Sequence, residues 1–150
     1  AKDLATMPSS SLGSHFSIFL RENNLNPIFY PKLKATDEAT LLRMRARQTH
    51  DLWHVLTGFD TSYLGEAGLQ AFYLAQLRSV LSAIIIGLFF VHFVRYKPSQ
   101  LNYFFLELER GWKMGRAAKP LIEVTFENHF GDSLPALREQ LQINVLAQAH

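Results

Sequence analysis

The sequence predicts an all-α protein: a single-domain bundle of long helices with a kinked C-terminal helix. Apolar residues recur at helical spacing along most of the chain, while strand-like alternation and hairpin turns are essentially absent. The chain has 150 residues, of which 48% are hydrophobic, so it can form one domain with a substantial core. We therefore expect an irregular lead-in over residues 1–14 and a single helical domain over residues 15–150.

Two helices are predicted in the first part of the chain. A short amphipathic helix is expected over residues 15–22, and prolines then interrupt the chain. Thr36 is suited to cap the next helix, because acidic residues follow it in the first turn, where the helix dipole favours them. That helix should run to about Thr57 and end at Gly58.

The second part of the chain has further helical stretches. Residues 65–94 are predicted to form one long helix, with Gly87 as the point where it could break. A third long helix begins near Gln100, and Pro120 should kink or restart it. The last helix covers residues 134–141. Three small residues form a seam on which another helix can approach closely: Gly111, Gly115 and Ala118.

The stretch Val80–Val94 carries no charged residue and has more than one interpretation. It is too short to cross a bilayer, because fifteen residues of helix span only about 22 Å. The default is a central helix buried in the bundle. The alternatives are a wall that binds an apolar tail, with Ile84, Leu88 and Val91 as contacts, or a surface that enters lipid.

A metal-binding motif lies on the helix that ends near Thr57: His50, Asp51 and His54, followed after eleven residues by Glu66. Imidazoles at positions i and i+4 lie about 40° apart on a helix and can hold one ion between two nitrogens. Asp51 is near enough to be a further ligand or to orient an imidazole, and Glu66 could close the site from a neighbouring helix. We predict all four as ligands and as catalytic residues. The set suits zinc, iron or manganese, and magnesium less well.

Arg43 and Arg47 share a helical arc of roughly 100° with the motif, and apolar residues occupy most of the remaining circumference. Solvated faces are usually built from Lys and Glu, and this arc has neither. We therefore interpret it as an internal polar pocket. The two arginines are predicted to bind an anionic substrate.

The composition excludes several classes of protein. The absence of cysteine excludes disulfides, thiolate metal sites, iron–sulfur clusters and cysteine nucleophiles. The net charge is only +2 and no long basic run is present, which argues against nucleic acid but leaves an anionic membrane surface as a partner.

Two blocks of this sequence are characteristic: RARQTHDLWHVLTGFDTSYLGEAGLQAF, with the H-D-x-x-H motif and the later Gly-Glu, and GWKMGRAAKPLIEVTFENHFGDSLPALREQLQI. They are similar to the central and C-terminal blocks of the coenzyme Q (ubiquinone) biosynthesis protein four family, which the chain resembles. The resemblance covers roughly residues 11–143.

This resemblance implies an all-helical protein that binds one divalent ion at the motif, zinc foremost, and accommodates a prenylated aromatic or isoprenoid lipid. It implies peripheral association with the cytoplasmic side of a bacterial inner membrane, or with the matrix side of the mitochondrial inner membrane in a eukaryote. The implied partners are other quinone-biosynthesis proteins, and a homodimer is left open.

Two roles follow from the resemblance. One is oxidative decarboxylation of a polyprenyl-benzoate precursor, and the other is a non-catalytic organiser that holds the prenylated intermediate within the biosynthetic complex. The residues alone also allow a metal-dependent phosphohydrolase that uses a metal-bound hydroxide. We rank the hydrolase last, because the remaining histidines show no ligand spacing.

Overall fold

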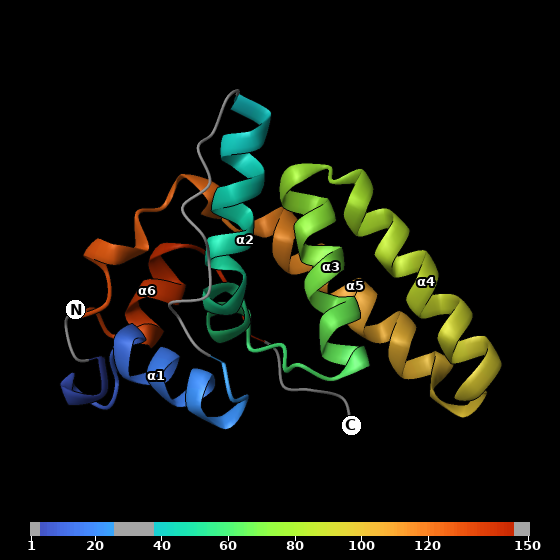
Figure 1. The fold of residues 1–150 in the computed structure, drawn as a ribbon, viewed down its shortest axis with the longest axis horizontal. Coiled ribbons are helices and arrows are strands. Elements are labelled where there is room, and N and C mark those ends of the chain that lie inside the picture. The colour runs from blue at the N-terminus through green and yellow to red at the C-terminus, as the bar shows by residue number, and fades with distance from the viewer. Residues whose placement is uncertain (1–3, 26–37, 146–150) are drawn as a thin grey trace. The chain divides into compact units, whose positions relative to one another are not determined.

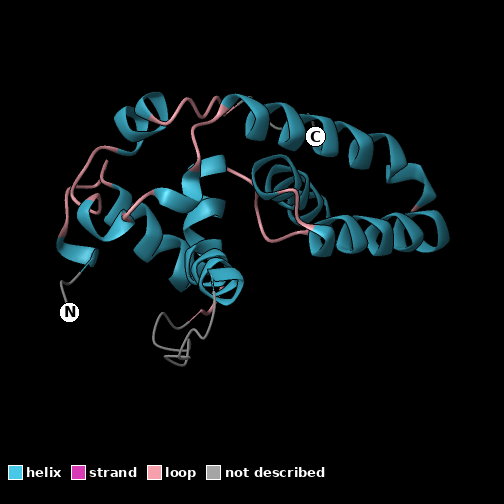
Figure 2. Ribbon diagram, turned by 90° about the horizontal axis from the view of Figure 1, so that it is seen from above, coloured by secondary structure: helices cyan, strands magenta, loops and turns pink. Residues whose placement is uncertain are grey.

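The all-α prediction is confirmed. A computed structural model describes residues 4–25 and 38–145, and its regular elements there are helical, apart from an isolated bridge between Ser11 and Ser133 (Figures 1 and 2). The predicted cap at Thr36 lies outside the described residues.

The chain forms two compact units, and each combines two separate stretches of sequence. The first unit consists of Ala1–Leu56 and Pro120–Gln140, and the second of Thr57–Lys119 and Leu141–His150.

The part of the first unit that the structure describes consists of short and long helices and their connections. The helix predicted over residues 15–22 begins earlier, because the Ser11 side chain caps it by accepting from the Ser14 backbone N–H at 3.2 Å. The predicted end of α2 at Thr57 is confirmed, and Gly58 follows with a left-handed φ of 74°. In chain order, the elements of the first unit are η1 (Leu4–Thr6), α1 (Leu12–Glu22), α2 (Glu38–Thr57), η3 (Leu121–Glu123), η4 (Phe126–Asn128) and α6 (Leu134–Gln140).

Over its described residues, the second unit consists of three long helices that pack on one another, with a short 3-10 turn between the last two. The prediction of one helix over residues 65–94 is wrong, because the chain breaks at Arg78, which adopts a left-handed φ of 51°. Ser79 then caps a new helix by accepting from the Ser82 backbone N–H, whereas Gly87 lies inside that helix without breaking it. In order, its elements are α3 (Tyr63–Leu77), α4 (Val80–Tyr96), η2 (Pro98–Gln100) and α5 (Leu101–Ala117).

Close backbone contact joins α3 to α5. A Cβ atom at Gly111 would clash with the Gly68 carbonyl oxygen, and one at Gly115 would lie 2.8 Å from the carbonyl oxygen of Phe72. Gln76 reinforces the contact by donating to the Gly115 carbonyl oxygen at 2.7 Å. The predicted small-residue seam is therefore a packing surface.

The sequence predicted that Pro120 would kink or restart the helix that begins near Gln100, and the structure shows that the helix ends before this proline. The helix ends at Ala117, and Pro120 opens the 3-10 turn η3 instead of bending a continuous helix. A proline lacks the N–H that a continuing helix would need.

Helix α4 is not the buried central helix that its composition suggested. Its inner side is packed, with Phe93 in a cluster with Ala67 and Phe104, but most of its apolar residues are exposed. None of the helices in the described ranges combines the length and apolar character needed to cross a membrane.

Replacing Gly111 with Ala should destabilise the fold by about 2 kcal/mol, because the new methyl group meets backbone atoms that cannot move aside. Gly87→Ala is the matched control, since a Cβ atom there meets nothing within 4 Å. It should leave stability unchanged or raise it by up to about 1 kcal/mol through helix propensity. Urea denaturation of both variants measures the difference, and equal shifts would contradict the packing role of the seam.

Candidate metal centre

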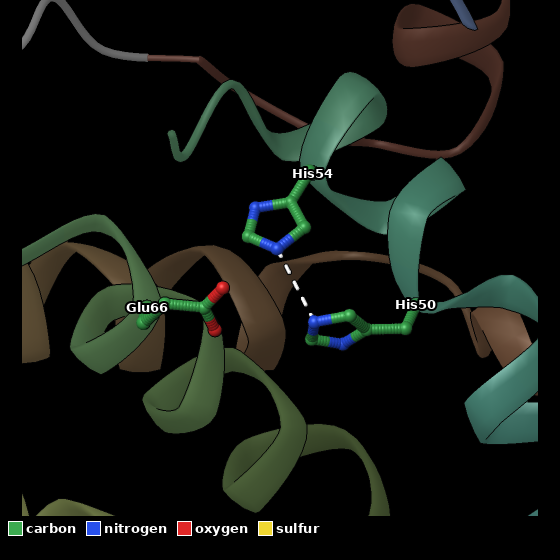
Figure 3. Close-up of side chains that lie close together, drawn as sticks. All are labelled: His50, His54 and Glu66. Atoms are coloured by element: carbon green, nitrogen blue, oxygen red, sulfur yellow. Dashed lines mark hydrogen bonds between the residues drawn. The ribbon is translucent and has the colours of Figure 1, made fainter. Parts of the chain in front are cut away.

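Two imidazoles face each other on one side of α2. The Nε2 atoms of His50 and His54 are 3.3 Å apart, and the ring planes are nearly perpendicular at 84° (Figure 3). His54 is buried with 2% of its surface exposed, and His50 is half-buried. The i, i+4 spacing therefore brings the two nitrogens together as the sequence predicted.

This separation fits a shared metal ion. Nitrogen ligands at the usual zinc distance of about 2.0–2.1 Å, in a tetrahedral arrangement, lie about 3.3–3.4 Å from each other. The observed Nε2 separation of 3.3 Å has that value. The same pair forms a hydrogen bond when one ring donates and the other accepts.

Neighbouring elements of the first unit fix the end of α2 that carries His54. From α1, the Phe19 ring stacks on the His54 ring at 5.3 Å and 23°. From α6, the Arg138 guanidinium donates to the carbonyl oxygens of Val55 and Leu56, each at 2.8 Å. These are among the last carbonyls of the helix, which have no partner within it and favour a nearby cation. Desolvation by burial lowers the pKa of Arg138.

A second arginine ties α2 to the C-terminal part of the first unit. Arg45 donates to both carboxylate oxygens of Glu127, at 2.9 and 3.2 Å, and to the Val124 carbonyl oxygen at 2.7 Å. The hydrogen bond from Arg45 lowers the pKa of Glu127. The contacts of Phe19, Arg45 and Arg138 were not predicted from the sequence, because no local spacing connects these residues to the motif.

The remaining polar residues of α2 occupy different environments. Asp51 is half-buried, and it is not a member of the candidate metal-ligand group that contains His50. The sequence predicted that the polar arc of α2 forms an internal pocket. Arg47 is exposed, so the arc is not internal along its whole length. The Arg43 side chain lies outside the described residues.

Glu66 lies in the first turn of α3, in the second unit. Ser62 caps this helix, since its hydroxyl accepts from the Gly65 backbone N–H at 3.1 Å and its carbonyl oxygen from the Glu66 N–H at 2.8 Å. The Glu66 side chain is half-buried. Its position next to a capped helix start places a carboxylate on a well-defined backbone.

The predicted tail contacts Ile84, Leu88 and Val91 lie on the exposed side of α4, with 55%, 65% and 60% of their surface exposed. Their expected burial in the core is wrong. Their contact with an apolar ligand stays a prediction.

Fold and site together define an all-helical protein whose second helix presents a pair of imidazoles, one buried and one half-buried. The family described as "Coenzyme Q (ubiquinone) biosynthesis protein Coq4" matches residues 1–147. The chain therefore belongs to the Coq4 family, as its resemblance implied.

Individual relatives agree with this assignment. The chain is 32% identical to "Ubiquinone biosynthesis protein coq4, mitochondrial" of Aspergillus fumigatus, over 93% of this chain and 49% of that protein. It is 32% identical to the "COQ4 homolog, mitochondrial" of Rattus norvegicus, over 94% of this chain and 53% of that protein. The chain thus spans about half the length of the curated relatives it matches. A crystal structure of a putative ubiquinone biosynthesis protein from Nostoc punctiforme matches with a TM-score of 0.82 and 34% identity, covering 95% of this chain and 67% of that one.

Arg138→Met should reduce the free energy of unfolding by about 2–3 kcal/mol, because it leaves two carbonyl groups at the end of α2 without their charged donor. Arg116→Met is the matched control, since Arg116 is exposed on α5 and its change should stay within about 0.5 kcal/mol. Urea denaturation measures both. A loss at Arg138 no larger than that at Arg116 would show that the guanidinium does not hold the end of α2.

Proposed function

We propose that this protein acts in ubiquinone biosynthesis as an oxidative decarboxylase of a polyprenylated aromatic acid. In this proposal the motif residues His50, His54 and Glu66 hold one divalent metal ion, with zinc as the first candidate. The observation that carries the proposal is the imidazole pair, whose Nε2 separation of 3.3 Å fits two ligands of one ion. Membership of the Coq4 family supports the pathway.

The proposed reaction breaks one bond and forms another at the same ring carbon. The bond to the carboxylate carbon breaks and CO2 leaves, while a bond to oxygen forms in its place. The electron pair released when CO2 leaves passes to dioxygen, which is reduced to hydrogen peroxide, and water supplies the oxygen of the new ring hydroxyl. When bound, the metal would supply a positive centre that polarises the carboxylate or phenolate of the acid.

The chain's own residues have three proposed roles. His50 and His54 present nitrogen donors from a fixed helix, and Glu66 adds an anionic oxygen that binds the ion or accepts a proton. Arg47, one turn before His50, is exposed and able to meet an incoming carboxylate, and we assign Arg43 the same role. Asp51 would orient an imidazole or act as a further ligand.

The substrate class also implies a place of action. A polyprenyl tail partitions into lipid, so we propose that the protein works peripherally at the membrane where the quinone is made. A non-catalytic organiser that holds the prenylated intermediate would need the same location, and the Glu66 experiment below separates the two roles.

Purified protein should carry about one equivalent of metal per chain, and His54→Ala should lose it, because one imidazole and one carboxylate bind a divalent ion much more weakly than the full ligand set. His129→Ala is the matched control, since His129 bonds to Asp132 at 2.7 Å and has no role in the motif. Native mass spectrometry with elemental analysis gives the stoichiometry. Full occupancy in folded His54→Ala protein would refute the ligand assignment.

Glu66→Gln should abolish quinone production and cause a prenylated aromatic acid to accumulate, while the protein stays folded. Gln keeps the shape of the side chain but lacks the anionic oxygen that a metal or a transferred proton requires. The control is Glu109→Gln, which changes an exposed carboxylate paired with Lys113 on α5. Lipid extracts of strains whose only copy is the variant provide the measurement. Normal quinone levels with Glu66→Gln would leave the organiser as the better account.

A further inference from the structure

Helix α4 presents an apolar face to its surroundings. Six residues that are about half exposed or more make up this face, with exposures from 49% at Val94 to 74% at Val80. Exposed apolar residues gathered on one side of a helix of a folded protein point to an interaction site. We call it the α4 face, and its members are Val80, Leu81, Ile84, Leu88, Val91 and Val94.

The exposure of this face does not reflect a loosely attached helix. The opposite side of α4 packs on α3 and α5, where Phe93 is fully buried beside Ala67 and Phe104 (Figure 1). Ser79 caps its start through the Ser82 N–H. The helix is therefore a rigid element that presents one apolar side outward.

The apolar surface continues onto α5. The rings of Phe90 on α4 and Phe105 on α5 lie 6.1 Å apart, and both are more than 40% exposed. Leu106 and Tyr103 on α5 are also exposed, at 46% and 41%. The surface is thus wider than a single helix.

The charged residues on α4 and immediately before and after it all have one sign. From Arg78 to Leu106 the sequence contains no Asp or Glu, and its three charged residues are Arg78, Arg95 and Lys97. All three are exposed, one before α4 and two at its end. Cationic side chains at both ends of an apolar helix can reach lipid headgroups while the apolar residues enter the acyl region.

We infer that the α4 face is the part of this protein that enters the membrane, lying in the interfacial layer of a bilayer that contains anionic lipids. The inference rests on the peripheral location proposed above and names the surface responsible. A second copy of the chain fits less well, because a symmetric contact through α4 would bring the same cations of both copies together. Anionic headgroups instead neutralise them.

The chain lacks cysteine, so single-cysteine variants carry a fluorescent label at one chosen position. We would label Leu88→Cys on the α4 face and, as the matched control, Ile18→Cys, an exposed aliphatic position on α1. Vesicles contain phosphatidylcholine with or without phosphatidylglycerol, and brominated acyl chains serve as quenchers. The label at residue 88 should be quenched by brominated lipid in the anionic vesicles, and the label at residue 18 should not.

Leu88→Glu should lower partitioning into anionic vesicles by about tenfold or more, because it removes one apolar anchor and adds a charge. Ile18→Glu should leave partitioning unchanged, and Arg95→Glu should weaken it for anionic vesicles only. Circular dichroism checks that each variant is folded. His54→Ala should bind vesicles like the wild type, so failure of the metal proposal is distinguishable from failure of this one.

Two results would overturn the inference. One is equal quenching at residues 88 and 18, or none at residue 88 in protein that floats with vesicles. The other is a dimer in solution, seen by light scattering, that Leu88→Glu converts to a monomer while the wild type does not bind vesicles. That outcome would assign the α4 face to a second copy.

Discussion

The need to accommodate polar groups in the interior governs the first unit. The last three turns of α2 carry His54 and Thr49 inside the protein, with 2% of each residue exposed, along with the terminal carbonyls of the helix. A buried polar group without a partner costs about 1–3 kcal/mol, so each one constrains its surroundings. The Thr49 hydroxyl donates to the Arg45 carbonyl oxygen at 2.9 Å. The Arg138 guanidinium donates to the carbonyl oxygens of Val55 and Leu56 at the end of α2. Elements distant in sequence are thereby fixed around the imidazole pair.

The second unit follows a different constraint, which is close approach of backbones. Glycines on α3 and α5 allow the two helices to meet almost without intervening side chains, and Gln76 bridges them with a hydrogen bond. With that contact made between α3 and α5, α4 packs against them by one side only. Its remaining apolar residues have no covering element among those the structure describes. An outward apolar face is thus a consequence of how the unit is built.

The sequence predicted the features that depend on local spacing. Helix α2, its end at Gly58 and the approach of the two imidazoles all follow from positions a few residues apart. The contacts from Arg138 to Leu56 and from Arg45 to Glu127 each connect residues 82 positions apart, and no local pattern reveals such pairs.

Two errors concern the stretch from α3 to α4, and they have physical causes. The helical pattern of apolar residues continues through Arg78, and a left-handed turn at a residue other than glycine is not recognisable from the sequence. The break could still have been suspected at Ser79, because serine is a favoured N-cap residue. An apolar, uncharged sequence also does not distinguish a helix that is buried within its own chain from a helix that keeps an exposed apolar face. The expected burial of α4 was therefore wrong, while the uncharged segment itself was identified correctly.

We propose that His50 and His54 are ligands of one ion and not merely hydrogen-bonded to each other. Anomalous X-ray diffraction from crystals of protein purified from its own host, recorded on both sides of the absorption edge of the metal found, distinguishes the two arrangements. We expect one anomalous peak at bonding distance from both Nε2 atoms, about 2.0–2.1 Å if the ion is zinc. Metal-loaded crystals with their peak elsewhere, and the two imidazoles still at hydrogen-bonding distance with nothing between them, would contradict it.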